Sequence, residues 1–342
     1  MTGRPTYKIA FVNEASSLIG MGHILRSQVL ARIMFARGYT ISGFTIGDKN
    51  AVSYAEEQMK HENFKWSIRV MQDTQAAIDD IVHIPPHLVV IDCSKASRDI
   101  VIACKAFGIR ILALDYFSYE QPLPDAIINL IDHSAVSLSG QSLIREGLVY
   151  HEGPQYAIIR DEFILARNYR ISKSELALPK KILIAFGGAD PSGNSKRALN
   201  ILLNWPGEFL VDLIIGPLFK LEVESITASV SHKFKITIHK SPSYISKLFE
   251  AADLVFCGGG GTLLEAIYVG IPAIVIAQNE SELRHAKSLA QRQACWMLED
   301  VDWEIVSSTD NRNKRSKYSR ACVDGLGAER ICDVIEQQLN KI

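Results

Sequence analysis

Short apolar runs alternate along the chain with longer segments in which apolar residues recur at helical spacing. The run KIAFV (8–12) is typical of a buried strand, and residues 23–38 follow with helical periodicity and a glycine stop at Gly38. The remaining elements of this first series are expected as strands at 40–46, 64–70, 87–92, 109–115 and 125–130 and as helices at 54–62 and 97–108. Strands that alternate with helices predict a parallel sheet with helices on both faces.

A second series of the same kind follows a polar segment within 150–178. Its strands are expected at 180–188, 209–216, 233–240, 253–259 and 272–278, and its helices at 194–205, 243–252, 262–270 and 327–339. Two series predict an α/β protein of two Rossmann-like domains, with parallel sheets that face an interdomain cleft. We expect an N-terminal domain over 1–160 and a C-terminal domain over 161–342, whose last helix packs back on the N-terminal domain.

Composition narrows the class of protein. Of the 342 residues 47% are hydrophobic and 22% are charged, which suits large cores, and the net charge of −1 argues against nucleic acid as a partner. No apolar run is long enough to span a bilayer, and the N-terminal sequence lacks the apolar core of a secretory signal. The six cysteines form no CxxC pair or Cys/His cluster, so we expect no metal site and a reduced, soluble, cytoplasmic protein.

The stretch IGMGHILR (19–26) follows the first strand and raises the first chemical hypothesis. Gly20 and Gly22 would let the backbone approach an anion at the start of a helix, although the stretch matches neither GxGxxG nor a P-loop. His23 would be well placed as a general base, with Glu14 or Asp115 as the carboxylate that tunes it. A tight turn with an incidental histidine is the equal alternative.

Glycine-rich turns also follow two strands of the second series. Four consecutive glycines at 258–261 are costly in conformational entropy, so they indicate close approach of the backbone to another group. Thr262 begins the next helix, where its hydroxyl and the first amides would hold a phosphate, and Glu265 would suit a ribose diol. The alternative for Glu265 is a solvated helix residue. A third glycine turn lies at 186–195 and is either a further ligand-binding turn or a plain strand-to-helix turn.

Polar residues end several other strands. Asp92 and Asp115 each follow an apolar run, where a carboxylate serves an active site or caps the next helix with equal frequency. Gln278 and Asn279 end a late strand, and their amides would read a base or a sugar hydroxyl, or cap a helix. These strand ends gather at one edge of each predicted sheet, where ligands bind in doubly wound folds.

Taken together, these motifs resemble the GT-B nucleotide-sugar superfamily, and most closely the UDP-sugar hydrolases of the pseudaminic acid pathway with the related spore-coat polysaccharide proteins. The shared stretches, in order, are EASSLIGMGHILRS (14–27), GPQYAIIRDEF (153–163), LIAFGGADPSG (183–193), GGGGTLLEAIYVGIPAIVI (258–276) and DGLGAERI (324–331). They extend along nearly the whole chain.

The resemblance implies a GT-B fold in which the C-terminal domain binds UDP and His23 activates water to attack the anomeric carbon. It assigns His23 as the catalytic base, Gly260, Gly261 and Thr262 to the phosphates and Glu265 to the ribose. With the strand-end residues, the candidate site is His23, Asp92 and Asp115 as catalytic, Gly188, Gly260, Gly261, Thr262, Glu265, Gln278 and Asn279 on the nucleotide, and Glu14, Gly20, Gly22, Tyr156 and Arg160 on the sugar and phosphates. It implies a nucleotide-sugar substrate, UDP-linked, and no cofactor.

The sugar side departs from the family pattern. The first strand ends Val12-Asn13-Glu14 where the family has Arg-x-Asp, and Asp92-Cys93-Ser94 stands where it has Asp-His-Tyr. These changes keep an inverting glycosyltransferase open as the alternative to the hydrolase, and a non-catalytic nucleotide-sugar binding subunit as a third hypothesis. A transferase that acts on lipid acceptors would present basic residues, but Arg26, Arg32 and Arg37 are explained equally well as a solvated helix face.

Overall fold

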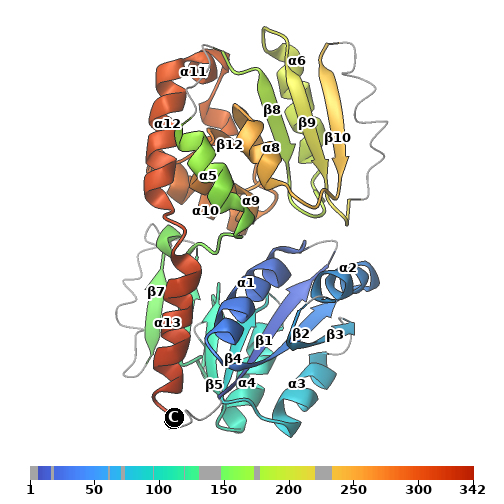
Figure 1. The fold of residues 1–342 in the computed structure, drawn as a ribbon, viewed down its shortest axis with the longest axis vertical. Coiled ribbons are helices and arrows are strands. Elements are labelled where there is room, and N and C mark those ends of the chain that lie inside the picture. Colours follow the sequence, from blue (N-terminus) through green and yellow to red (C-terminus); the bar gives the residue numbers. More distant parts are fainter. Residues whose placement is uncertain are drawn as a thin grey trace. The chain divides into compact units, whose positions relative to one another are not determined.

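The computed structural model describes residues 7–16, 19–60, 62–70, 74–94, 96–118, 120–130, 148–172, 178–219 and 233–342. The chain divides into two compact units, the first formed by Met1–Ile158 and Leu326–Ile342 and the second by Ile159–Gly325. Each unit is built around one parallel sheet (Figure 1). The predicted α/β class with two Rossmann-like domains is confirmed.

Among the described residues, the sheet of the first unit has seven strands in the order β3-β2-β1-β4-β5-β6-β7. The strands are β1 (Lys8–Ala15), β2 (Thr40–Gly47), β3 (Lys65–Val70), β4 (Leu88–Asp92), β5 (Arg110–Leu114), β6 (Ala126–Asn129) and β7 (Val149–Glu152). The helices are α1 (Gly22–Ala36), α2 (Lys49–Met59), α3 (Thr74–His83), α4 (Ser97–Ala106), the 3-10 helix η3 (Pro154–Tyr156) and α13 (Gly327–Leu339). The order reverses between β1 and β4, and the carboxyl ends of these strands form the switch point at which such sheets bind ligands.

The two faces of this sheet bury separate cores, because successive side chains of a strand point to opposite faces. Phe11 and Val90 pack with α1 and α13, whereas Val12 and Ile91 pack with α3 and α4. Figure 1 shows α13 alongside the strands of the first sheet, far in sequence from its neighbours.

The helix α13 belongs to the first unit by burial and by charge. Ile331 and Ile335 are fully buried in the same core as α1. Arg37, at the end of α1, pairs with three carboxylates of α13, among them Asp333 at 3.0 Å. The C-terminal segment therefore completes a core that begins with β1.

The second unit, over the described residues, has a six-stranded sheet in the order β10-β9-β8-β11-β12-β13. The strands are β8 (Lys181–Ala185), β9 (Leu210–Ile215), β10 (Lys235–Lys240), β11 (Leu254–Cys257), β12 (Ala273–Val275) and β13 (Trp296–Met297). The helices are α5 (Glu162–Ser172), α6 (Asn194–Asn204), α8 (Ser246–Ala251), α9 (Gly261–Val269), α10 (Glu280–Gln291), η4 (Leu298–Asp300), α11 (Trp303–Ser307) and α12 (Thr309–Cys322). The switch point of this sheet lies between β8 and β11.

Some elements differ from the expected ones. The helix expected at 54–62 begins earlier, at Lys49, because the carboxylate of Asp48 accepts a hydrogen bond from the backbone N–H of Ala51 at 3.0 Å and caps it. The structure also contains α3, β7, α5, α10, β13, α11 and α12, which the apolar pattern does not predict. No helix in the described ranges has the length and apolar character needed to cross a membrane.

Candidate functional site

The turn after β1 presents the start of α1 at the switch point of the first sheet. Gly20 has a φ of 83°, a left-handed conformation that favours glycine, and its backbone exchanges two hydrogen bonds with Ser16. A Cβ on Gly22 would meet nothing within 4 Å, so the surroundings of this glycine are open. The helix has no side-chain cap, and no acidic residue lies in its first turn. Both features suit the approach of an anion to the helix N-terminus.

His23 pairs with a fully buried carboxylate at this end of the helix. Its Nδ1 lies 2.6 Å from Oδ1 of Asp92, whose side chain is 0% exposed while that of His23 is 20% exposed. A terminal nitrogen of Arg26 also lies 3.3 Å from Nδ1, but the contact with Asp92 is much shorter, and because an ionised carboxylate only accepts hydrogen bonds, that contact assigns the proton to Nδ1. Among the described residues, Nε2 has no hydrogen-bond partner. The imidazole therefore presents a proton acceptor on the side away from Asp92.

The ionised state of Asp92 depends on its neighbours. Burial by itself raises the pKa of a carboxyl group, but the charges of Arg26 and His23 and their hydrogen bonds outweigh it and hold the pKa of Asp92 below its usual range. Asp92 is the last residue of β4 and points to the face that α1 covers, so the strand pattern itself delivers this carboxylate to His23.

Arg26 joins this pair to a second carboxylate. Its Nε lies 3.0 Å from Oδ2 of Asp92 and one terminal nitrogen lies 2.5 Å from Oδ1, while the other terminal nitrogen lies 2.7 Å from Oδ2 of Asp115. Asp115 follows β5 with a φ of 48°, and its Oδ1 accepts a hydrogen bond from the N–H of Leu130 at 2.8 Å. The sequence interpretation of Arg26 as part of a solvated helix face is wrong, because this guanidinium connects two strand ends.

The carboxylate that contacts His23 is not one of the two expected from the sequence. Asp115 reaches His23 only through Arg26, and Glu14 lies on the opposite, α4-facing side of the sheet. The buried carboxylate of Glu14 accepts hydrogen bonds from the backbone N–H and hydroxyl of Ser94, both at 2.8 Å, and from the N–H of Ala96 at 2.7 Å. Glu14 thus stabilises the turn that precedes α4.

Three of the four consecutive glycines at 258–261 lie against Glu282, and the fourth does not. A Cβ on Gly259 would lie 2.3 Å from the backbone oxygen of Glu282, and one on Gly258 would lie 2.8 Å from a carboxylate oxygen of the same residue. A Cβ on Gly261 would meet nothing within 4 Å. A Cβ on Gly260 would also lie 3.3 Å from a carboxylate oxygen of Glu282, so most of the close approach expected from the glycines is made by α10 of the same unit, and the open position is Gly261, the first residue of α9.

Glu282 and His285 of α10 hold the glycine turn, and the sequence pattern gave no reason to expect either residue. One carboxylate oxygen of Glu282 accepts hydrogen bonds from the N–H of Gly259 and of Gln278, both at 2.9 Å. Nδ1 of His285 lies 2.6 Å from the carbonyl oxygen of Gly259. These contacts from α10 fix the conformation of the glycine turn.

Helix α9 begins without a cap at this turn. Its N-cap residue, Gly260, offers no side chain, and no acidic residue lies in the first turn. The N–H groups of Gly261 and Thr262 donate no hydrogen bond within the described structure. Two adjacent donors at the positive end of a helix dipole form a ready anion site.

Glu265 lies one turn further along α9 and forms an ion pair. Its Oε1 lies 2.7 Å from Nε of Arg160, whose other end contacts Glu162 at 2.8 Å and whose guanidinium lies over the ring of Phe163 at 5.0 Å. Burial raises the pKa of Glu265, and the charge of Arg160 opposes that rise. Oε2 of Glu265 has no hydrogen-bond partner among the described residues, so it is available to accept a hydrogen bond from a hydroxyl group.

In the glycine turn after β8, the side chain of Asp190 binds the N–H groups at the start of the next helix, α6. The carboxylate of Asp190 accepts hydrogen bonds from the N–H groups of Asn194 at 2.8 Å and Ser195 at 2.9 Å, so the start of α6 is already capped by an anion. A Cβ on Gly216 would lie 2.4 Å from the carbonyl oxygen of Gly188, which also accepts the N–H of Leu218. Gly188 thus lies at close range to the turn that follows β9.

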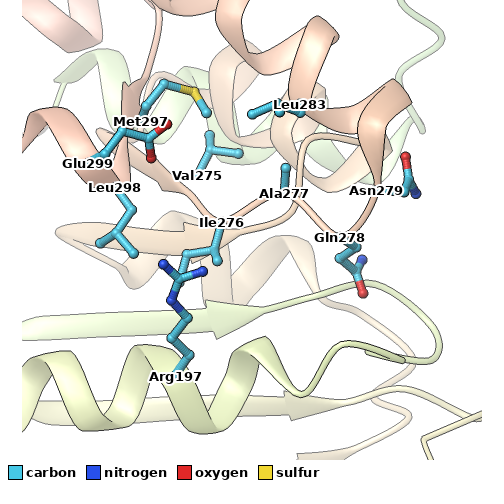
Figure 2. A pocket seen from close by; sticks show the side chains of 10 residues that line it. All are labelled: Arg197, Val275, Ile276, Ala277, Gln278, Asn279, Leu283, Met297, Leu298 and Glu299. Atoms are coloured by element: carbon cyan, nitrogen blue, oxygen red, sulfur yellow. The ribbon is translucent and has the colours of Figure 1, made fainter.

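Gln278 and Asn279 line a cavity of about 250 Å³ at the carboxyl end of β12 (Figure 2). Asn279 is the N-cap of α10, since its Oδ1 accepts the N–H of Glu282 at 2.9 Å; for this residue the helix cap is what the structure shows. The side chain of Gln278 donates to the carbonyl oxygen of Phe186 at 3.3 Å, while its Oε1 is buried with no hydrogen-bond partner in the described structure. Figure 2 shows the side chain of Arg197, another lining residue, extending from α6 toward Ile276.

Comparisons with known proteins agree with this architecture. The chain superposes on MurG of Acinetobacter baumannii with a TM-score of 0.66 at 14% identity, covering 96% of this chain and 99% of that one. It superposes on HepE of Anabaena, solved in complex with UDP-glucose, with a TM-score of 0.61 at 13% identity, covering 98% of both chains. The chain has the GT-B fold.

Sequence comparisons add a domain match and two relatives. Residues 206–319 match the glycosyltransferase family 28 C-terminal domain. An uncharacterised protein of Methanocaldococcus jannaschii is 30% identical over 284 residues, which are 80% of this chain but only 56% of that protein's length. The spore coat polysaccharide biosynthesis protein SpsG of Bacillus subtilis is 26% identical over 341 residues, covering 93% of this chain and 94% of the relative.

Within the GT-B fold, the predicted site residues fall into separate groups. His23, Asp92 and Asp115 come together in the first unit, where Arg26 connects them, and Gly261, Thr262 and Glu265 come together in the second. Tyr156 packs against the core of the first unit, and burial raises the pKa of its hydroxyl. Across the described residues, no three His, Cys, Asp or Glu side chains cluster in a way that would hold a metal ion.

Proposed function

We propose that the protein is a nucleotide-sugar hydrolase that cleaves the anomeric C–O bond of a UDP-sugar. The products would be UDP and a free amino-deoxy sugar, for nonulosonic acid or surface polysaccharide synthesis. The observation that carries this proposal is the pairing of His23 with the buried Asp92, which leaves Nε2 of the imidazole as a proton acceptor. A group so oriented is suited to act as a general base.

The reaction follows from these groups. Nε2 of His23 takes a proton from water as its oxygen bonds to the anomeric carbon. The bond from that carbon to the phosphate oxygen breaks, its electron pair leaves with UDP, and the configuration inverts. The resulting imidazolium is stabilised by the carboxylate of Asp92. Because a nucleoside diphosphate is a good leaving group, no separate proton donor is needed.

The second unit would hold the nucleotide. The uncapped start of α9 offers the N–H groups of Gly261 and Thr262 to the diphosphate, and Oε2 of Glu265 would accept hydroxyls of the ribose. The family 28 domain match covers this helix, and the fold is shared with HepE, whose structure contains UDP-glucose. Both observations support a UDP-linked substrate.

An inverting glycosyltransferase is the second candidate. It would use the same base and the same nucleotide site but accept a sugar-hydroxyl or lipid-linked hydroxyl in place of water. The match of residues 206–319 to a glycosyltransferase domain favours it, whereas the similarity to SpsG over nearly the whole chain is compatible with either activity.

One experiment separates these candidates. The purified protein is incubated with a panel of UDP- and CMP-sugars without acceptor, and free sugar and nucleotide are followed by NMR. Release of UDP and free sugar that is lost in His23→Ala but kept in His83→Ala, a change at an exposed histidine of α3, supports hydrolysis. Binding without turnover, followed by turnover when an acceptor is added, would identify a transferase.

A further inference from the structure

The guanidinium of Arg26 is the centre of the polar cluster in the first unit. It uses two nitrogens on the two oxygens of Asp92 and a third on Asp115, at 2.5 to 3.0 Å. Its side chain is 19% exposed, and that of Asp92 is 0% exposed. Such a planar fork holds a carboxylate in one orientation, which a lysine ammonium cannot do.

The orientation of Asp92 decides the state of His23. A buried carboxylate on β4 has one oxygen, Oδ1, directed at Nδ1 of His23, and Arg26 contacts both oxygens of that same carboxylate. Without the fork, the carboxylate would be free to rotate and to direct either oxygen elsewhere. The hydrogen bond that one ring nitrogen makes determines which nitrogen of a histidine carries the proton.

We infer that Arg26 is the positioning residue of this site: bound between Asp92 and Asp115, it holds the Nδ1–H tautomer of His23 and keeps Nε2 free to accept a proton. Arg26 does not touch Nε2; it acts through Asp92, whose Oδ1 lies 2.6 Å from Nδ1 of His23, and its own terminal nitrogen approaches that Nδ1 only to 3.3 Å. Asp115, whose Oδ1 accepts the N–H of Leu130 while its Oδ2 contacts Arg26, is the anchor that orients Arg26.

The inference is tested first without turnover. In protein labelled with ¹⁵N-histidine, long-range ¹H–¹⁵N spectra at pH 8 distinguish the two neutral tautomers, and the His23 signals are assigned by their loss in His23→Gln. The wild type is expected to show the Nδ1–H form alone. Arg26→Met and Arg26→Lys are expected to show a mixture of both tautomers. The matched control is Arg32→Met on the same helix, where the side chain is 53% exposed and pairs with Glu62; it is expected to leave the tautomer unchanged.

The second arm is kinetic, and it alone rests on the proposed function. Arg26→Lys is expected to lower kcat by about 10²-fold with KM within a factor of about three, since the loss is in the base and not in binding. A pure Nδ1–H form in Arg26→Met overturns the inference. If His23→Ala retains full activity, the proposed function fails, while a tautomer mixture in Arg26→Met would still establish the positioning role. If the Arg26→Met protein does not fold, Asp115→Asn, which keeps an acceptor for the N–H of Leu130, provides the same comparison.

Discussion

Nε of Arg160 lies 2.7 Å from Oε1 of Glu265, and this ion pair opposes the rise in the pKa of Glu265 that burial in α9 causes. Burial favours the neutral acid, and the guanidinium favours the carboxylate. The pair therefore links two residues that the sequence assigns to different parts of the ligand, the sugar or phosphate for Arg160 and the ribose for Glu265.

Arg160→Met is expected to weaken UDP binding most strongly at acidic pH. Without the guanidinium the pKa of Glu265 rises further, so the carboxylate that accepts ribose hydroxyls forms only at higher pH. The Kd for UDP, measured by calorimetry from pH 5 to pH 8, should fall with rising pH more steeply in the variant than in the wild type. Arg167→Met, which removes a guanidinium that bonds backbone carbonyls of the same unit, is the control. Parallel pH profiles would contradict the coupling.

Glu265→Gln is expected to restore part of the stability that Arg160→Met loses. A carboxyl group with a raised pKa in the folded state favours folding at low pH and loses that advantage as the pH rises. Arg160→Met alone should therefore lose roughly 1–3 kcal/mol of unfolding free energy at pH 7 and less at pH 4. The double variant Arg160→Met/Glu265→Gln should recover much of this loss. Urea unfolding at both pH values measures the difference.

Gly259→Ala and Gly261→Ala are expected to differ although both add one methyl group to the same turn. The first places a Cβ 2.3 Å from the backbone oxygen of Glu282 and should cost about 1–3 kcal/mol, whereas the second meets nothing within 4 Å. Gly261→Asp should keep the fold but raise the Kd for UDP by about tenfold or more, because it puts an anion at the start of α9. Tm values and UDP titrations are the measurements; unchanged affinity in Gly261→Asp would exclude this helix as the phosphate site.

Asp190→Asn provides the complementary test at α6. Asp190 caps this helix through Asn194 and Ser195, so losing its charge should lower stability by about 1 kcal/mol and leave UDP affinity unchanged. Asparagine tolerates the left-handed backbone at this position, where φ is 47°. A large loss of UDP affinity with little loss of stability would instead place the phosphates at this turn.

Asp92→Asn is expected to destabilise the first unit at neutral pH and much less in acid. The pKa of Asp92 is held below the usual 3.8 in the folded protein, so its contribution is present above that pH and is lost as the pH falls through the lower folded value. Breaking this buried pair should cost roughly 3 kcal/mol at pH 7. Asp79→Asn, at an exposed residue of α3, should change little at either pH in the same unfolding experiments.

The sequence predicts the fold and part of the site because both depend on local patterns. Apolar runs locate the central strands, and a carboxylate directly after such a run, as in Asp92, lies at the carboxyl end of a sheet. Helices α10 and α12 escape this reasoning because they are strongly polar and bury few side chains, among them His285 and Arg312. An apolar period is then too weak to distinguish a helix from a polar loop.

The partners of the site residues are harder to predict than the residues. The three-residue spacing of His23 and Arg26 places them on one side of α1, and this was the available signal for Arg26. Asp92, and not Glu14, contacts His23 because α1 covers the face of the sheet to which Asp92 points. This packing is tertiary structure, which local sequence patterns do not predict. Glycines likewise indicate that the backbone approaches another group closely, but they do not identify that group. At Gly259 it is Glu282.

The place of α13 has a consequence for the order of events during synthesis. Ile331 and Ile335 fill the core against α1, so the ribosome must synthesise α13 before the first unit can close. The second unit, Ile159–Gly325, is contiguous and has all its strands available earlier. The unit that carries His23 is thus begun before the second unit and completed after it. Until α13 emerges, the apolar side of α1 is exposed and offers a surface on which a nascent-chain chaperone would act.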